Sequence, residues 1–368
     1  MLVALVAIVT LAAAPQALAA TASYDHVVIV LMENHSRDEI KPAQAPFITS
    51  FGAQDTDFRA ITHPSLPNYL ALTSGFTQGC DNDRCPPASL RVANIFAQLG
   101  SDARSLAESM PHNCTLVDAR PYVAHHNPQV YYVNSPCASQ DEPLGDSPDL
   151  SARFTFVTPN LNHDMHDGSV AAGDDWFRGF MDQVHASPEW KNDRTAVVLT
   201  FDEGSGSDQN IWLAVDSNQG QPKDISTPAN LADLLATMES VLGEPVIGPG
   251  DASLLLPLFP GAGSAQPGGG GLLSNLSVTP DPATTGAMIN FTLARDSQID
   301  VTIRDAGGNL VRHLTDFGGL WSAGLDGAFW GLHGDNGDRV PAGTYRATMR
   351  AQADDGTTDV ATVPIDVG

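Results

Sequence analysis

His26-Val27-Val28-Ile29-Val30-Leu31 is an unbroken run of apolar residues after its first histidine, and it leads directly into Met32-Glu33-Asn34-His35-Ser36. A strand without polar alternation is buried on both faces, which is typical of a parallel sheet covered by helices. Further apolar runs, at 154–157, 196–200 and 211–215, alternate with predicted helices at 45–54, 91–99, 174–186 and 228–241. This alternation predicts an α/β domain over residues 21–260, with a mostly parallel sheet flanked by helices.

The pattern of the chain changes after residue 260. Residues 261–275 are Gly-rich and lack apolar periodicity, which indicates a flexible linker. Residues 276–368 contain short alternating strands separated by turns, of which Asp305-Ala306-Gly307-Gly308-Asn309 and Asp335-Asn336-Gly337-Asp338 are typical hairpin turns. The expected strands are 288–294, 299–304, 309–313, 326–331, 343–352 and 358–366. This region is predicted to be a small β-sandwich, whose aspartates are turn formers, with a calcium site as the alternative.

The charge of the chain restricts its partners. There are 43 Asp and Glu residues against 18 Lys and Arg, which gives a formal net charge of −25. A nucleic-acid-binding protein must neutralise phosphates with Lys and Arg, so nucleic acid is not an expected partner. An anionic substrate requires a metal ion or a local group of Arg and His to invert the field. A hydrophobic fraction of 42% excludes a wholly disordered chain.

Residues 1–20 form an apolar run that ends in Ala17-Leu18-Ala19, a pattern that signal peptidase accepts. We interpret it as a cleaved signal peptide, with an N-terminal membrane anchor as the alternative. No other run is long enough to span a membrane, so the protein is expected to be secreted, extracellular or at the cell surface. Export favours disulfides, and we expect Cys80–Cys85 and Cys114–Cys137. A zinc site is the rival interpretation, although neither pair has CxxC spacing.

Polar residues follow three of the apolar runs. Glu33 and Asn34 follow the first, Asp202 and Glu203 follow 196–200, and a third polar cluster at 158–168 follows 154–157. Ligands of open α/β sheets bind at the carboxyl ends of the strands, so these oxygen ligands converge if the strands are neighbours. Such a set suits a divalent cation, with Ca, Mg, Mn or Fe all admissible. The plainer interpretations are a helix N-cap at Glu33-Asn34 and a solvated strand exit at Asp202-Glu203.

Ser65 is the candidate nucleophile. It lies between Pro64 and Pro67, and Tyr69–Thr73 has the pattern of the first turns of a helix. A serine near a helix N-terminus can be activated by the helix dipole and by a metal that coordinates its Oγ. The alternative is that Ser65 is only a turn residue.

Five motifs carry a family resemblance: MENHS (32–36), AITHPSLPNYLALTSG (60–75), AHHNPQVYY (124–132), VTPNLNHDMHDGS (157–169) with GDDWF behind it, and LTFDEGSG (199–206). In this order they resemble the phosphoesterase family of secreted bacterial acid phosphatases. That family is related to phosphatidylcholine-type phospholipases C and, more distantly, to the alkaline-phosphatase superfamily. The resemblance covers about residues 24–250 and implies an alkaline-phosphatase-like sheet.

The resemblance also implies roles for individual residues. Glu33, Asn34, Asp202 and Glu203 would bind a metal, and Ser65 would be both the nucleophile and a metal ligand. The residues that would bind phosphate or protonate the leaving group are His125, His126, His163, Asp164 and His166. Asn210 and Thr227 stand where relatives tend to have histidine-containing segments, which argues against a second metal. Residues 275–368 resemble the Ig-like domain of flagellar hook-capping proteins, which implies an accessory module for surface association.

These observations predict a secreted, metal-dependent acid phosphatase that acts through a phosphoserine intermediate. Its expected partners are a small phosphorylated substrate or a phospholipid head group. The alternatives are a phospholipase C-like phosphodiesterase and a catalytically weak surface-binding protein. A sulfatase is disfavoured because the chain has no CxPxR-type context for formylglycine formation.

Overall fold

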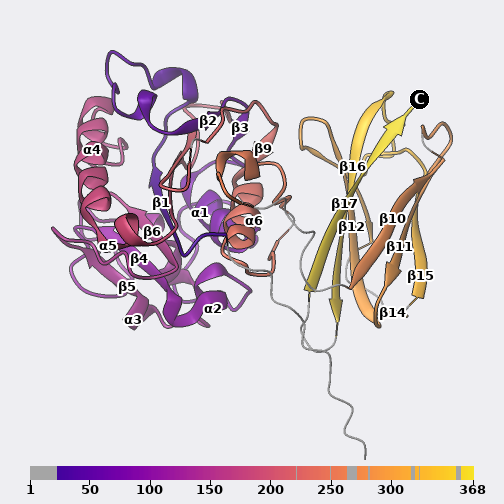
Figure 1. The fold of residues 1–368 in the computed structure, drawn as a ribbon, viewed down its shortest axis with the longest axis horizontal. Helices are drawn as coiled ribbons and strands as arrows, with labels where there is room; N and C mark the ends of the chain where they lie inside the picture. Colours follow the sequence, from indigo (N-terminus) through magenta and orange to yellow (C-terminus); the bar gives the residue numbers. More distant parts are fainter. Residues whose placement is uncertain are drawn as a thin grey trace, which may run out of the picture.

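The computed structural model describes residues 23–368 apart from 221, 249, 263–271, 281, 316–319, 323 and 354–357. The predicted signal peptide and most of the predicted linker lie outside the described residues. Figure 1 shows an α/β domain on the left and a β-sandwich on the right, with α6 (Leu231–Val241) beside the sandwich. None of the helices in the described part of the chain is long and apolar enough to cross a membrane.

The α/β domain is built on a seven-stranded sheet with the order β2-β8-β7-β1-β6-β4-β5. Its strands are β1 (His26–Met32), β2 (Ala53–Asp55), β4 (Ala103–Glu108), β5 (Asp141–Leu144), β6 (Phe154–Thr158), β7 (Thr195–Phe201) and β8 (Leu213–Ser217). The strands from β7 to β5 are mutually parallel, whereas β8 and β2 are antiparallel to their neighbours. This confirms the predicted α/β fold with a mostly parallel sheet.

Helices cover both faces of the sheet, so that every residue of β1 after His26 and every residue of β7 is buried. In Figure 1, α4 (Val170–Ala186) and α5 (Pro188–Asn192) lie at one side of the domain, and α1 (Ser65–Ser74) lies with α6 at the other. The shorter helix α2 (Ile95–Leu99) begins after Asn94, whose side chain accepts a hydrogen bond from Ala97 N. The remaining elements are short: α3 (Cys137–Gln140), β3 (Phe58–Arg59), β9 (Ala229–Asn230) and the 3-10 turns η1 (Arg37–Glu39), η2 (Ile48–Ser50), η3 (Gly100–Asp102), η4 (Ala124–His126), η5 (Pro128–Tyr131) and η6 (Leu256–Leu258).

The expected helix at 45–54 is wrong. Only the turn η2 forms there, and β2 follows it at the sheet edge. Gly52 separates the two elements with a φ of +54°, and a Cβ at this position would lie 2.2 Å from the carbonyl oxygen of Val215. The close approach of this backbone to β8 is a tertiary contact, and it prevents the helix from continuing.

The C-terminal region is a β-sandwich of two antiparallel sheets around one apolar core. One sheet has the order β10-β11-β15, and the other has β13-β12-β16-β17 with β14 beside β12. The strands are β10 (Leu273–Thr279), β11 (Ala287–Leu293), β12 (Ser297–Asp305), β13 (Leu310–Thr315), β14 (Leu320–Trp321), β15 (Gly324–Trp330), β16 (Gly343–Ala353) and β17 (Thr358–Val367). Because β10 begins at Leu273, the end of the predicted linker at 275 is wrong by three residues.

The sandwich contacts the α/β domain through α6 and the chain that follows it. Ala236, Val246 and Val360 form a small buried apolar cluster across the junction. At the edge of this cluster, Arg346 Nη1 lies 2.6 Å from Asp251 Oδ2. The two domains are therefore packed against each other along this surface.

Both predicted disulfides are present. Cys80 pairs with Cys85, and Cys114 pairs with Cys137. The rival zinc interpretation is wrong, since all four sulfurs are bonded to one another in pairs. The only group of three potential ligand atoms within 4.8 Å of one another in the described part of the chain is Cys114, Cys137 and Asp141, and both of its sulfurs belong to a disulfide.

Candidate active site

The site is assembled at the carboxyl ends of three adjacent parallel strands. Glu33 follows β1, Asp202 follows β7, and Asp164 lies in the loop after β6. The backbone hydrogen bonds continue beyond the strands, because Asp202 N donates to Met32 O at 3.0 Å and Glu33 N donates to Asp164 O at 2.8 Å. This continuation brings the three carboxylates to one edge of the sheet, and all three are fully buried.

Ser65 is the first residue of α1, and its hydroxyl is directed at this acid cluster. Its Oγ donates a hydrogen bond of 3.0 Å to Glu33 Oε2. Tyr69, one helical turn later, donates a hydrogen bond of 2.6 Å to Glu33 Oε1. Residues four apart lie on the same face of a helix, so α1 delivers both hydroxyls to one carboxylate.

The N-terminus of α1 offers little to an incoming anion. Leu66 N already donates to Asp83 Oδ1 at 3.0 Å, and Pro67 has no N–H. Asp83 comes from the loop that the Cys80–Cys85 disulfide closes. The first turn of the helix is therefore capped by a carboxylate from this loop, which leaves the Ser65 amide as its unassigned donor.

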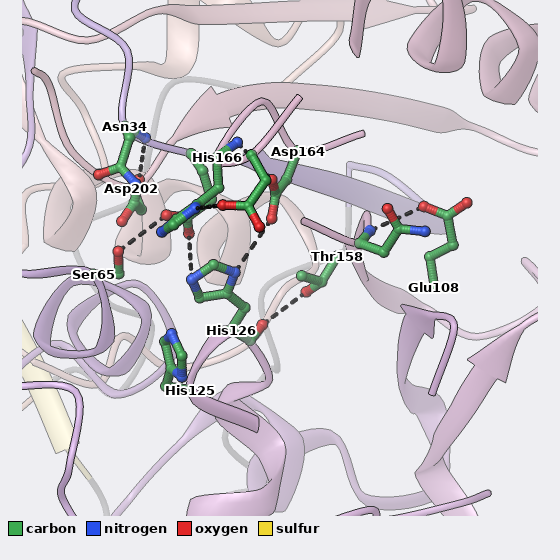
Figure 2. A network of polar contacts seen from close by, with 12 residues as sticks. Asn34, Ser65, Glu108, His125, His126, Thr158, Asp164, His166 and Asp202 are labelled. Atoms are coloured by element: carbon green, nitrogen blue, oxygen red, sulfur yellow. Dashed lines mark hydrogen bonds and ion pairs between the residues drawn. The ribbon is translucent and has the colours of Figure 1, made fainter. Parts of the chain in front are cut away.

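His126 lies between two of the acids. Its Nε2 is 3.4 Å from Glu33 Oε1 and its Nδ1 is 3.2 Å from Asp164 Oδ2. Figure 2 shows the contact between His126 and Asp164 as a dashed line. The ring also stacks on Tyr69, with a centroid distance of 5.4 Å. Burial and the neighbouring His125 and His166 hold the pKa of His126 well below its usual value, so the ring is neutral. A neutral ring donates through one nitrogen only. His126 Nδ1 is within hydrogen-bond distance of Asp164, whereas Nε2 has no hydrogen-bond partner.

The buried acids have raised pKa values. Burial is the main cause, and it raises the pKa of Asp164 and of Asp202 to about 7. The pKa of Glu33 is raised well above its usual value by burial and then by the charges of Asp202 and Asp164. No lysine or arginine forms an ion pair with any of these three acids among the residues that the structure describes. The cluster therefore lacks a compensating cation from the protein.

The donor atoms fit a divalent cation. Asp202 Oδ2 and His126 Nε2 are buried without a hydrogen-bond partner, and Ser65 Oγ lies beside the same carboxylates. Buried polar atoms are normally satisfied, and hard oxygen donors with an imidazole suit several divalent metals. The electrostatics of the cluster therefore support a metal site. Without the metal, no three of the residues Glu33, Asp164, Asp202 and His126 have ligand atoms that all lie within 4.8 Å of one another.

The other predicted metal ligands lie beside this cluster. Asn34 N donates to Asp202 Oδ1 at 3.0 Å, and the residue has a φ of +57°, a left-handed conformation that Asn tolerates better than most residues. Glu203 Oε2 instead lies 3.0 Å from His63 Nδ1. Burial and the charges of Asp202 and Asp83 raise the pKa of Glu203 to about 8.

The predicted histidines divide into two groups. The rings of His125 and His166 lie 4.5 Å and 5.7 Å from the ring of His126, so these three form one wall of the site. His163 lies apart from this wall, because its Nδ1 is 2.9 Å from Glu108 and its ring stacks on Trp176. The structure thus brings together every predicted site residue except His163, with Glu203 at the margin.

Sequence reasoning missed two residues of the site. Tyr69 had a usable signal, since it follows Ser65 by four positions on a predicted helix. His63 lies two residues before Ser65, and only the fold shows that it faces Glu203. Asn210 and Thr227 lie outside the acid cluster: Asn210 Nδ2 donates to Thr56 O at 3.4 Å, and Thr227 N donates to Asp55 Oδ1 at 3.1 Å.

A buried cluster of acids and histidines around a serine, at the carboxyl edge of a parallel sheet, is an arrangement suited to the hydrolysis of phosphoric esters. The profile of the Phosphoesterase family matches residues 41–229. This chain belongs to the Phosphoesterase family, and it is a hydrolase that acts on phosphoric ester bonds.

Relatives with assigned names support this class. The chain is 34% identical over 254 residues to the Phosphatidylinositol-3-phosphatase of Mycobacterium tuberculosis, covering 64% of this chain and 84% of that protein. It is 31% identical over 192 residues to an acid phosphatase of Aspergillus fumigatus, covering 46% of this chain and 42% of that protein. The chain thus spans less than half of the length of that fungal relative.

Solved structures give weaker likenesses. The lipoteichoic acid synthase LtaP from Listeria monocytogenes has a TM-score of 0.46 at 12% identity, with 82% of this chain and 89% of that chain covered. A protein in the alkaline phosphatase superfamily from Vibrio parahaemolyticus has a TM-score of 0.42 at 12% identity, with 94% and 84% covered. The family assignment rests on the sequence match and not on these scores.

Proposed function

We propose that the protein is a metal-dependent acid phosphatase that hydrolyses phosphomonoesters through a phosphoserine formed on Ser65. The observation that carries this proposal is the hydrogen bond of 3.0 Å from Ser65 Oγ to Glu33 Oε2, inside a buried acid cluster with no arginine or lysine paired to it in the described chain. A hydroxyl held against a buried carboxylate has an acceptor for its proton at the moment of attack.

The metal would be held by Glu33 and Asp202, with Ser65 Oγ and the His126 ring as further donors. When bound, it would supply positive charge for the phosphate and lower the pKa of the Ser65 hydroxyl. The acids of the cluster are then ionised at a lower pH than in the free protein. Asn34 holds Asp202 in place through its backbone N–H.

The chain's own residues account for both steps. Ser65 Oγ attacks phosphorus in line, so that an Oγ–P bond forms while the bond from phosphorus to the leaving alcohol breaks. The leaving oxygen takes a proton from the histidine wall, in which His125 and His166 lie closer to solvent than His126. Water then attacks the phosphoserine and passes a proton to the histidine wall, the Oγ–P bond breaks, and Ser65 recovers its proton from Glu33.

The names of the relatives favour a monoester substrate. The mycobacterial relative is named Phosphatidylinositol-3-phosphatase, and the relative from Aspergillus fumigatus is named an acid phosphatase. We therefore place phosphomonoesters ahead of phosphodiesters, with a phosphoinositide head group among the candidates. We further propose that the enzyme is secreted, since disulfides persist in oxidising compartments.

The test is a panel of substrates at several pH values. The purified protein is assayed with p-nitrophenyl phosphate, a phosphoinositide monophosphate and bis-p-nitrophenyl phosphate, with EDTA and after return of Mg²⁺, Ca²⁺, Mn²⁺ or Fe²⁺. We expect monoester hydrolysis that EDTA removes and one of the cations restores. Faster hydrolysis of the diester would contradict the monoesterase assignment, and full activity in EDTA would contradict the metal.

A further inference from the structure

The segment that carries His125 and His126 has little regular structure of its own. It consists of the turns η4 and η5, which meet at Asn127. The carbonyl oxygen of His126 accepts a hydrogen bond of 3.0 Å from Thr158 Oγ1, which fixes one side of the segment (Figure 2). A short pair of turns is not rigid by itself, so the position of the His126 ring depends on such anchors.

Asn127 supplies the second anchor, in a separate buried polar group. Its Nδ2 lies 3.0 Å from Asp141 Oδ1, 2.9 Å from Asp141 Oδ2 and 3.2 Å from Tyr122 OH. Tyr122 donates its own proton to Thr115 O at 2.6 Å, so its oxygen accepts from Asn127. Asn127 and Asp141 are both fully buried. The two amide protons of Asn127 are therefore fully used, one by Tyr122 and one by the Asp141 carboxylate.

Asp141 is itself held firmly at the edge of the sheet. It is the first residue of β5 and pairs in register with Ser105 of β4. Its carbonyl oxygen accepts a hydrogen bond of 3.1 Å from Cys114 N, and Cys114 is joined to Cys137 four residues before Asp141. Strand pairing and the disulfide thus fix the position of the Asp141 carboxylate, to which Asn127 donates its hydrogen bonds.

The pair also has an energetic reason to stay together. No lysine or arginine pairs with Asp141 in the described part of the chain, and burial raises the pKa of its carboxyl to about 7. Loss of the Asn127 amide would leave a buried carboxylate without its main donor, which is strongly unfavourable. The contact between Asn127 and Asp141 is therefore stable, and it fixes the backbone next to His126 relative to β5.

We propose that Asp141, acting through Asn127, is a positioning residue that holds His126 between Glu33 and Asp164. The effect of this positioning on turnover rests on the proposed function. The contacts of His126 to these two carboxyls are 3.4 Å and 3.2 Å, so a displacement of about 1 Å breaks both. Displacements of this size away from the reacting atoms can lower turnover by about 100-fold.

The test exchanges the two partners. D141N leaves two amides facing each other, N127D leaves two carboxylates, and the double variant N127D/D141N restores one amide and one carboxylate. We expect each single variant to lower kcat for p-nitrophenyl phosphate by about 10- to 100-fold with KM changed by less than about 3-fold. The exchanged pair should recover most of the loss. D146N, at an exposed aspartate in the loop after β5, is the matched control and should keep full activity.

A merely structural role is separated by combining D141N with H126N. If Asp141 acts through His126, D141N lowers kcat no further in the H126N background, while its effect on the melting temperature is the same in both backgrounds. The proposal would be overturned if the losses of kcat in D141N and H126N multiplied in the double variant, or if D141N alone left kcat unchanged.

A readout without turnover keeps this test independent of the proposed function. In protein with ¹³C-labelled histidine, the His126 signal, assigned from H126N, should shift in D141N, return in N127D/D141N and stay in place in D146N. If the wild-type protein hydrolysed no phosphoester, the proposed function would be wrong. The shift of the His126 signal would still show whether Asp141 positions His126. An unshifted His126 signal in D141N would refute it.

Discussion

The hydroxyl of Ser65 at the start of α1 and the carboxylate of Glu33 at the end of β1 are joined by a hydrogen bond of 3.0 Å. This contact joins the helix that carries the proposed nucleophile to the central strand of the sheet. The same carboxylate accepts from Tyr69 and approaches His126, so Glu33 is the residue on which the site converges. Changes at Glu33 or at its hydrogen-bond donors are therefore expected to affect the stability of the protein, its pH dependence and its catalysis.

Removal of the Tyr69 hydroxyl should destabilise the protein and weaken catalysis. Y69F deletes a hydrogen bond of 2.6 Å to a buried carboxylate, and hydrogen bonds to charged groups contribute about 1.5–3 kcal/mol. We expect a loss of this size in the free energy of unfolding, measured by urea denaturation, and a fall in kcat.

The matched control is Y132F. Tyr132 is also buried, but its hydroxyl lies 2.7 Å from the neutral Thr73 hydroxyl, away from the acid cluster. Y132F should lose only about 1 kcal/mol, with kcat unchanged. Equal losses of kcat in the two variants would show that Tyr69 acts only through packing.

The acid cluster predicts how stability depends on pH when divalent cations are removed. The unfolded carboxyls titrate at about 4, whereas Asp164 and Asp202 titrate at about 7 in the folded protein. Between these values the folded state binds more protons than the unfolded state, so this contribution to stability is present at low pH and is lost as the pH rises from about 4 to about 7. In EDTA, the melting temperature should be lower at pH 8 than at pH 5.

Two comparisons attribute this effect to the cluster. D202N removes one of the titrating groups and should reduce the difference in melting temperature between pH 5 and pH 8. A divalent cation added to the wild-type protein at pH 8 should raise its melting temperature, because it binds the folded state. A wild-type melting temperature that rises from pH 5 to pH 8 in EDTA, and is equally high in D202N, would be incompatible with this account.

The contact between the two domains should stabilise the α/β domain. V360D places a carboxylate in the buried apolar cluster with Ala236 and Val246, and we expect a loss of several kcal/mol or separation of the domains. R346A removes a partly exposed ion pair with Asp251 and should cost about 1 kcal/mol or less.

Differential scanning calorimetry measures both variants. One cooperative transition in the wild type and two in V360D would fit a docked sandwich. Two transitions in the wild type, unchanged in V360D, would show instead that the domains unfold independently.

The sequence predicted the centre of the site better than its surroundings. The apolar runs of β1 and β7 and the acids that follow them were sufficient to place Glu33 and Asp202 at one edge of a parallel sheet, because that edge is where parallel strands end together. Strand β4 and the edge strand β5 beside it escaped prediction. β5 contains Asp141, Glu142 and Pro143, a composition that only an edge position tolerates. The separation of His163 from the other histidines was also not readable, since it depends on the contact with Glu108.

The phosphoserine on Ser65 is the central claim, and acid quenching tests it most directly. The wild-type protein is mixed with p-nitrophenyl phosphate, quenched in acid within one turnover and digested, and its peptides are analysed by mass spectrometry. S65A is treated in the same way, with S50A as the control, since Ser50 is exposed and its hydroxyl donates to the backbone carbonyls of Pro46 and Phe47. We expect a phosphorylated peptide containing Ser65 in the wild type and in S50A, no such peptide in S65A, and a loss of at least about 10³-fold in its kcat. Full phosphatase activity in S65A, or a phosphoryl group trapped on another residue, would contradict the assignment.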